Sequence, residues 1–190
     1  MKLDRRQCLA VVMAVGAVVA GAANAQSYPE KPISVGVGYP PGGSTDLTAR
    51  TVATELGLKL GVPVVIENVG GAGGAIGAQK VASSAPDGYT LLVGASNELA
   101  INKLVTKKVK YDIKDFTAIG LVASQPLVLV ASPASGVKNA AEFTQLVAKN
   151  PGKFSYGSSG VGTSLHLAGE MLKDQGKLFM THIPYRGVAP

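Results

Sequence analysis

Four short loops rich in glycine, serine and threonine carry the residue types best suited to binding an anion. Each loop follows an apolar run and precedes a segment with helical periodicity. Glycine lets the backbone approach a ligand closely, and hydroxyl groups donate hydrogen bonds without adding charge, so such loops fit a carboxylate or a phosphate. The loops are residues 41–46, 71–74, 94–97 and 157–164.

The helix expected after each loop strengthens this preference for anions. The first backbone N–H groups of a helix have no partner within the helix, and the helix dipole is positive at that end. In an open parallel sheet the loops gather at the carboxyl ends of the strands, where ligands bind. Taken singly, each loop is equally typical of an ordinary turn between a strand and a helix, but the set of four favours an anion site.

Residues that would support catalysis are few. Residues 71–77 lack the third glycine of a dinucleotide-binding G-x-G-x-x-G loop, because Ile76 takes its place, and no G-x-S-x-G elbow occurs. His166 begins the helix after the last loop, where it would act as a base, contact a ligand or lie on the surface. We expect a structural role for His182, in a strand. The sequence therefore predicts a protein that is not an enzyme, with no cofactor and no metal.

Apolar periodicity predicts the elements that position the loops. Strand-like and helix-like segments alternate along the chain, which predicts an α/β fold with parallel sheets and helices on their faces. In the first half we expect strands at 33–39, 64–67 and 89–93, a helix whose apolar stripe runs from Ala49 to Leu60, and a second helix at about 75–84. In the second half we expect strands at 116–123, 127–131, 155–156 and 180–184, with helices after Asn139 and from the last loop to about Lys173.

Helix ends can be predicted from individual side chains. Ser44 or Thr45 is expected to cap the first helix, with Asp46 favoured in its first turn by the dipole. Gly61 should end that helix. Asn139 and Glu142 have the spacing of a capping box, and Gly176 is expected to close the last helix.

The first 25 residues have the features of an export signal. A basic head with Lys2, Arg5 and Arg6 precedes a charge-free apolar run, and the sequence Ala-Asn-Ala at 23–25 fits the small-x-small cleavage pattern. The apolar run is too short to span a bilayer comfortably. We expect cleavage after Ala25 and a periplasmic protein, exported by either the Sec or the twin-arginine route.

Charge and cysteine content exclude further classes. Removal of the signal lowers the net charge from +6 to +4 and removes Cys8, the sole cysteine. A chain without cysteine suits an oxidising compartment and cannot form a disulfide scaffold or a cysteine-based zinc site. The basic residues are scattered, and the densest group, at 107–110, is typical of a solvated surface turn. We therefore predict no nucleic-acid partner.

Several segments are distinctive as a set. They are YPEKPI at 28–33, PGGSTD at 41–46, ENVGGAGG at 67–74, PDGYT at 86–90, YGSSGVGTSLHLA at 156–168 and IPYRG at 183–187. Together, in this order and spacing, they resemble the Bug family, the extracytoplasmic solute-binding receptors of tripartite tricarboxylate transporters. The resemblance covers nearly all of the chain after the export signal.

This resemblance implies a periplasmic-binding-protein-like fold, in which two α/β lobes close on a small carboxylate such as a dicarboxylate, a citrate-like tricarboxylate or an acidic amino acid. It also implies delivery to the membrane permease subunits of a tripartite transporter, without catalysis or an obligatory arginine clamp. Asp46 is expected to orient its loop rather than to touch an anion. By position, the ligand-binding residues would be Pro41, Gly42, Gly43, Ser44, Thr45, Asp46, Ala95, Ser96, Asn97, Ser158, Ser159, Gly162, Thr163, Ser164 and His166.

The resemblance also predicts the domain organisation. We expect a signal peptide at 1–25, a first lobe at 26–123 that lacks its C-terminal return, and a partial second lobe at 124–190. Family members continue beyond the final motif, so the chain is expected to be a truncated receptor or a non-functional copy. Residues 26–190 alone should be poorly soluble and bind carboxylates weakly or not at all, because an incomplete parallel sheet exposes a strand edge. A complete receptor is expected to be monomeric.

Two alternative functions stay open at this point. The same fold would serve a ligand-binding sensor that signals to a membrane histidine kinase. A periplasmic hydrolase would use Ser158 or Ser159 as a nucleophile with His166 as its base.

Overall fold

The computed structural model describes residues 28–188, so the expected signal peptide and its cleavage site lie outside the described residues. All the helices and strands belong to one compact unit that begins at Lys31. No helix within residues 28–188 has the length and apolar character needed to cross a membrane.

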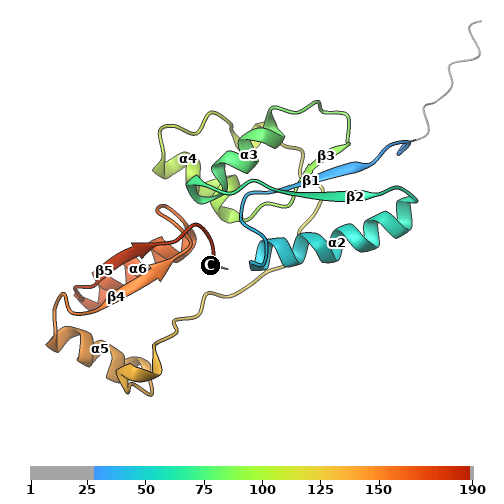
Figure 1. The fold of residues 1–190 in the computed structure, drawn as a ribbon. Helices are drawn as coiled ribbons and strands as arrows, with labels where there is room; N and C mark the ends of the chain where they lie inside the picture. Colours follow the sequence, from blue (N-terminus) through green and yellow to red (C-terminus); the bar gives the residue numbers. More distant parts are fainter. Residues whose placement is uncertain (1–27, 189–190) are drawn as a thin grey trace, which may run out of the picture. The chain divides into compact units, whose positions relative to one another are not determined.

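Three parallel strands form the first sheet (Figure 1). Strand β1 (Ile33–Val37) lies in the middle, with β2 (Val64–Asn68) on one side and β3 (Thr90–Leu92) on the other. Both pairings are parallel, as the sequence predicts. The loops that follow the three strands therefore leave from the same edge of the sheet.

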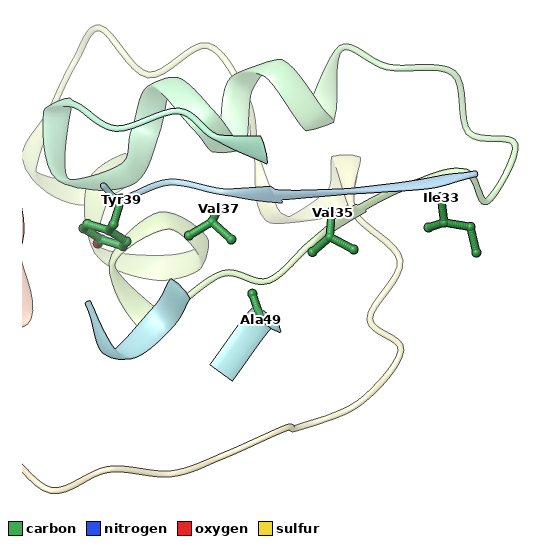
Figure 2. Packing of buried hydrophobic residues seen from close by; sticks show 5 residues of the cluster. All are labelled: Ile33, Val35, Val37, Tyr39 and Ala49. Carbon is green, nitrogen blue, oxygen red and sulfur yellow. The ribbon is translucent and has the colours of Figure 1, made fainter. Parts of the chain in front are cut away.

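One face of β1 forms the main core with α2 (Ser44–Leu60). Alternate side chains of a strand point to the same face, and Figure 2 shows Ile33, Val35, Val37 and Tyr39 in one row that faces Ala49 of α2. All five are buried. Burial of a side chain the size of valine or isoleucine contributes about 1.5–3 kcal/mol, so this row anchors the strand from which the first loop departs.

The other face of β1 packs against α3 (Ala75–Ala82) at very short range. A Cβ atom added at Gly36 would lie 2.6 Å from Cγ2 of Val81, and one added at Gly77 would lie 2.8 Å from the Gly38 Cα. At distances below 3 Å the neighbouring atoms would have to shift, so these glycines permit the helix to approach the strand this closely.

The second sheet consists of two parallel strands, β4 (Ser155–Ser158) and β5 (Thr181–Pro184). Helix α6 (Ser164–Gly176) connects them, and α5 (Ala140–Lys149) precedes them. Buried Val147, Leu178 and Met180 form a separate small core. The order strand, loop, helix, strand confirms the prediction for this part of the chain.

Short helical segments complete the described chain. The most unusual is a π-helical segment, η2 (Asn97–Ile101), which follows the loop after β3. Such segments are rare and occur frequently at functional sites. The others are η1 (Ala72–Gly74), α4 (Asn102–Val105), η3 (Ile113–Asp115) and η4 (Pro133–Ser135).

The prediction of strands at 116–123 and 127–131 is wrong. These residues are in neither a strand nor a helix, and Ile119, Leu121 and Val130 are 82%, 88% and 82% exposed. An apolar run forms a strand only where its backbone groups find a partner, and the described sheets offer none to this segment. High β-propensity alone did not suffice.

The predicted cap of α2 is also wrong. Gly43 occupies the N-cap position, and neither the Ser44 nor the Thr45 side chain caps the helix. Instead the Asp46 carboxylate accepts the Gly42 N–H at 2.9 Å. As predicted, Gly61 ends α2, with a φ of 70°.

Other predicted boundaries agree to within about three residues. The Asn139 side chain caps α5 by accepting the Glu142 N–H at 2.9 Å, which confirms that helix start. Helix α6 includes Gly176, and Lys177 with its φ of 49° ends the helix one residue later than predicted. A lysine accepts this left-handed conformation at some cost, so the glycine signal was off by one position.

Candidate functional site

The three loops that follow β1, β2 and β3 meet at one hydroxyl group. Tyr39, just after β1, places its hydroxyl 3.1 Å from the carbonyl oxygen of Gly73 in the second loop. The Asn97 amide of the third loop donates to the same hydroxyl at 2.6 Å. Asn102 also donates to the Gly73 carbonyl, at 2.9 Å. The parallel sheet thus brings together three loops that are far apart in the sequence.

The loop after β4 is joined to this group by a single direct hydrogen bond. The Ser164 N–H, at the start of α6, donates to the Asn97 side-chain oxygen at 2.8 Å. Asn97 therefore uses both ends of its amide, one for Tyr39 and one for α6. Its side chain is buried, as expected for an amide whose oxygen and nitrogen both have hydrogen-bond partners.

A cavity of about 240 Å³ lies among these loops. The lining residues with polar side chains are Tyr39, Ser159, Tyr185 and Arg186, and the others include four glycines. A small anion fits such a lining, because glycine loops let backbone N–H groups approach it and the other groups are neutral donors and one cationic residue. The lining residues are Tyr39, Gly71, Ala72, Gly73, Gly74, Ser159, Gly160, Val161, Pro184, Tyr185 and Arg186.

Arg186 is the cation of this cavity, although the sequence resemblance implied no arginine clamp. The ion pairs found among residues 28–188 leave its guanidinium without a carboxylate partner. A guanidinium presents a planar fork of donors that matches a carboxylate. The signal that would have found it is its position two residues after β5, at the carboxyl end of a parallel strand like the other loops.

The predicted loop at Pro41–Asp46 does not line the cavity. Pro41, Gly42 and Ser44 are exposed, Thr45 is half-buried, and Gly43 is buried. This loop lies at the carboxyl end of β1, as predicted, and Asp46 bonds it to Arg50 and Asn68.

Asp46 holds its own loop in place. Its Oδ2 accepts from the Gly42 N–H and from Arg50 Nε, each at 2.9 Å, and its Oδ1 accepts from Asn68 at 2.8 Å. The Arg50 hydrogen bond is the largest cause that lowers the Asp46 pKa, to about 2. Because both oxygens of this buried carboxylate have donors, the expected orienting role agrees with its contacts.

Ser158 is bonded to His182 and not to His166. The Ser158 Oγ lies 2.7 Å from His182 Nε2. It also contacts the Gly160 carbonyl oxygen and accepts from the Gly160 N–H. Ser158 is only 5% exposed. Ser158 therefore lacks the contact with His166 that the hydrolase alternative required of it, and a buried, bonded hydroxyl is poorly placed to attack a substrate.

Two histidines from different elements stack beside this serine. The rings of His166 on α6 and His182 on β5 lie 4.1 Å apart, and Tyr156 stacks on His182 at 4.9 Å. Burial is the main cause that lowers the pKa of His182, and the charge of His166 is the second, so the neutral form of His182 is favoured. The sequence predicted a structural role for His182, and its contacts with Ser158 and Tyr156 are of that kind.

The rest of the predicted residues shape the loops rather than line the cavity. Thr163 is buried and caps α6, accepting the His166 N–H at 3.4 Å and donating to Gly160 at 2.7 Å. The Gly162 N–H donates to His166 Nδ1 at 3.1 Å. Ala95 donates its N–H to Glu98, and Ser96 is exposed. Of the predicted residues, Ser159 alone lines the cavity.

The described residues provide no set of side chains that could bind a metal ion. Within residues 28–188, no group of three or more histidine, cysteine, aspartate or glutamate side chains could hold a metal ion. The site is thus built from hydroxyl, amide and guanidinium groups.

Parallel α/β units whose glycine-rich loops gather around a small cavity define a fold of the periplasmic-binding-protein type. Residues 48–190 match the model of the TctC family, the tripartite tricarboxylate transporter family receptors. The chain belongs to this family, whose fold is that of solute-binding receptors. The sequence prediction of a Bug-type receptor is thereby confirmed.

Curated relatives support the assignment over nearly the full chain. A UPF0065 protein of Bordetella pertussis is 40% identical over 98% of this chain and 56% of its own length. BugT of the same species is 34% identical over 100% of this chain and 59% of its own length. The chain therefore spans a little over half the length of these relatives.

Solved structures show the same fold with carboxylates bound. A Rhodopseudomonas palustris protein solved with malate, MatC, is 32% identical, with a TM-score of 0.77 over 84% of this chain and 55% of MatC. An R. palustris protein solved with adipate is also 32% identical, with a TM-score of 0.82 over 84% of this chain and 54% of the neighbour. These neighbours confirm the periplasmic-binding-protein fold.

Proposed function

We propose that this protein is a periplasmic receptor that captures a small carboxylate for a tripartite tricarboxylate transporter. The observation that carries the proposal is the cavity in which Arg186, Ser159 and glycine backbone converge. An unpaired guanidinium beside neutral donors favours a carboxylate over a neutral solute. Two similar structures hold dicarboxylates, adipate and malate.

The domain organisation is part of the same proposal. We assign residues 26–123 to a first lobe and residues 124–190 to a second, after an export signal at 1–25. The first sheet belongs to the first range and the second sheet to the second. In this arrangement the permease subunits of the transporter are the partner that receives the ligand.

A melting experiment with the purified chain tests the function. Malate and adipate, at up to tens of millimolar, should raise the melting temperature, because a ligand that binds only the folded state stabilises it by RT ln(1 + [L]/Kd). High concentrations are needed because the chain spans about half the length of its relatives. The uncharged diamides of the same acids should have no effect.

Arg186→Ala should weaken malate binding by about ten- to a hundredfold, the effect of losing a hydrogen bond to a charged group. The matched control is Lys149→Ala, which removes an exposed cation at the end of α5, away from the cavity lining. A folded chain whose melting temperature is unchanged by every carboxylate tried would contradict the proposed function. Equal losses in both variants would mean that only net charge matters.

A further inference from the structure

Glu98 is a fully buried carboxyl group that the proposed binding function does not use. It lies in the π-helical segment η2, and its exposed fraction is 0%. Its Oε2 lies 3.2 Å from the Ala95 N–H and 3.3 Å from the Tyr39 hydroxyl. Its Oε1 is buried without a hydrogen-bond partner among the described residues. An ionised carboxylate with one oxygen left without a donor is costly to bury.

The surrounding backbone is shaped to fit this carboxyl group. A Cβ atom added at Gly74 would lie 2.5 Å from the Glu98 Cγ, and one added at Gly38 would lie 3.0 Å from Glu98 Oε1. Gly74 also has a φ of 90°, which disfavours other residues. Two glycines from the loops after β1 and β2 thus make room for Glu98, so its position is built into the fold.

Among residues 28–188, no ion pair compensates the charge that Glu98 would carry. The titratable groups bonded to Glu98 are the hydroxyls of Tyr39 and of Tyr111, which donates to the Glu98 backbone carbonyl at 2.7 Å. On the packed helices, Lys103 of α4 contacts Tyr111 and Asp112, and Lys80 of α3 pairs with Glu67. Burial is the main cause that raises the Glu98 pKa to about 7. Glu98 is therefore partly protonated at neutral pH and changes charge there.

A short chain of hydrogen bonds connects Glu98 to the cavity. Tyr39 lines the cavity, contacts Glu98 and accepts from Asn97, which in turn holds the start of α6. Gly74, which encloses Glu98, lines the same cavity. A negative charge on Glu98 would face an anion across one side chain in a poorly screened interior.

We propose that Glu98 makes anion binding at this site proton-dependent: the site accepts a carboxylate ligand when Glu98 is protonated and loses affinity when Glu98 ionises. The proposal rests on the proposed carboxylate-binding function and adds its regulation. Glu98 is a positioning residue, acting through Tyr39 and the Gly73–Gly74 backbone. Since a ligand anion and the Glu98 carboxylate disfavour one another, ligand binding should also take up a proton.

The wild-type chain alone provides the first test. Malate affinity, measured by melting shifts or calorimetry, should fall on the order of tenfold between about pH 7 and pH 8.5, as the protonated fraction of Glu98 falls. Malate remains a dianion across this range, so its own charge does not change. Calorimetry in buffers of different ionisation enthalpy should show proton uptake on binding at about pH 7.5.

Glu98→Gln identifies the group, because glutamine keeps the shape and cannot ionise. In this variant the affinity should change less than twofold over the same pH range, and the proton uptake should vanish. Glu67→Gln, an exposed glutamate paired with Lys80, is the matched control and should behave as wild type. If malate binds wild type with the same affinity at every pH, the inference is overturned and the receptor function stands. If neither wild type nor E98Q binds any carboxylate, the proposed function itself fails, and the inference with it.

Discussion

The chain segments after β1 and β3 each bury a carboxyl group near the same edge of the first sheet, yet the pKa values of the two groups are shifted in opposite directions. Asp46 is 3% exposed and Glu98 is 0% exposed, so burial does not distinguish them. Asp46 has three donors, including the Arg50 guanidinium, which lower its pKa to about 2. From other described residues the Glu98 carboxyl group accepts two long hydrogen bonds, both at Oε2, and burial raises its pKa to about 7.

The comparison shows that the partners of a buried carboxyl group decide its protonation. Desolvation raises the pKa of any buried acid, and donors or cations lower it again. At Asp46 the donors lower the pKa more than desolvation raises it, so the carboxylate stays ionised and pairs with Arg50. At Glu98 desolvation raises the pKa more than the donors lower it, so the group is able to change charge near neutral pH. A rigid anchor and a titrating group thus lie in the segments that follow two adjacent strands of one sheet.

Removal of the anchor should have the largest effect. Asp46→Ala leaves the Gly42 N–H, the Arg50 guanidinium and the Asn68 amide without their acceptor. We expect a loss of about 2–4 kcal/mol in the free energy of unfolding, less than for a fully buried pair because Arg50 is half exposed. Urea unfolding at neutral pH measures it.

Asp174→Ala is the control for this measurement. Asp174 pairs with Lys177 on the surface, with both side chains more than four-fifths exposed. Such pairs contribute little, so a change below about 0.5 kcal/mol is expected. If the two variants were equally stable, Asp46 would not be an anchor and the contrast with Glu98 would disappear.

The titrating group should have the next largest effect, visible as a pH dependence of stability. Glu98 has a pKa of about 7 in the folded protein against its ordinary 4.5. Below about pH 4.5 both states hold the proton. As the pH rises to about 7, the folded state retains a proton that the unfolded state has released, so stability falls. Compared with Glu98→Gln, wild type should therefore lose about 2–3 kcal/mol between about pH 4.5 and pH 7.5.

Urea unfolding of wild type and E98Q at a series of pH values checks this prediction. The informative quantity is the difference between the two curves, because all other titrating groups are shared. A difference that stays constant with pH would mean that Glu98 is ionised in the folded state like an exposed glutamate. Asp46 and Glu98 would then both be ionised at neutral pH and would differ only in where they lie in the fold.

Sequence patterns predicted the parallel sheets and the four loops because both depend on local signals. The apolar row from Ile33 to Val37 and the cap at Asn139 are examples in which periodicity and side-chain chemistry agree with the structure. The loops at 71–74 and 157–164 were expected at a ligand site, and both contribute to the cavity.

The parts that sequence reasoning missed depend on contacts between distant residues. Glu98 has no partner carboxylate or cation nearby in the sequence, and its cradle comes from Gly38 and Gly74 on other loops. The Ser158–His182 contact joins two strands. The apolar run at 116–131 has strand-like composition, but a strand requires a partner that composition does not reveal. Arg186 could have been predicted, because it lies at the carboxyl end of a parallel strand, the criterion already used to select the other loops.

The smallest expected effect tests the link between Glu98 and the cavity. Tyr39→Phe removes the hydroxyl that contacts Glu98 Oε2 at 3.3 Å and accepts from Asn97 at 2.6 Å. The hydrogen bond from Tyr39 lowers the Glu98 pKa, so its loss should raise that pKa further and move the pH dependence of stability to higher pH. The unpartnered Asn97 amide should cost about 1 kcal/mol at all pH values. Carbon NMR of the Glu98 carboxyl in Y39F and wild type measures the shift directly. An unchanged or lower pKa in the variant would mean that the hydroxyl does not act on Glu98, and the cavity would then lack the contact through which a bound anion and this carboxyl group influence each other.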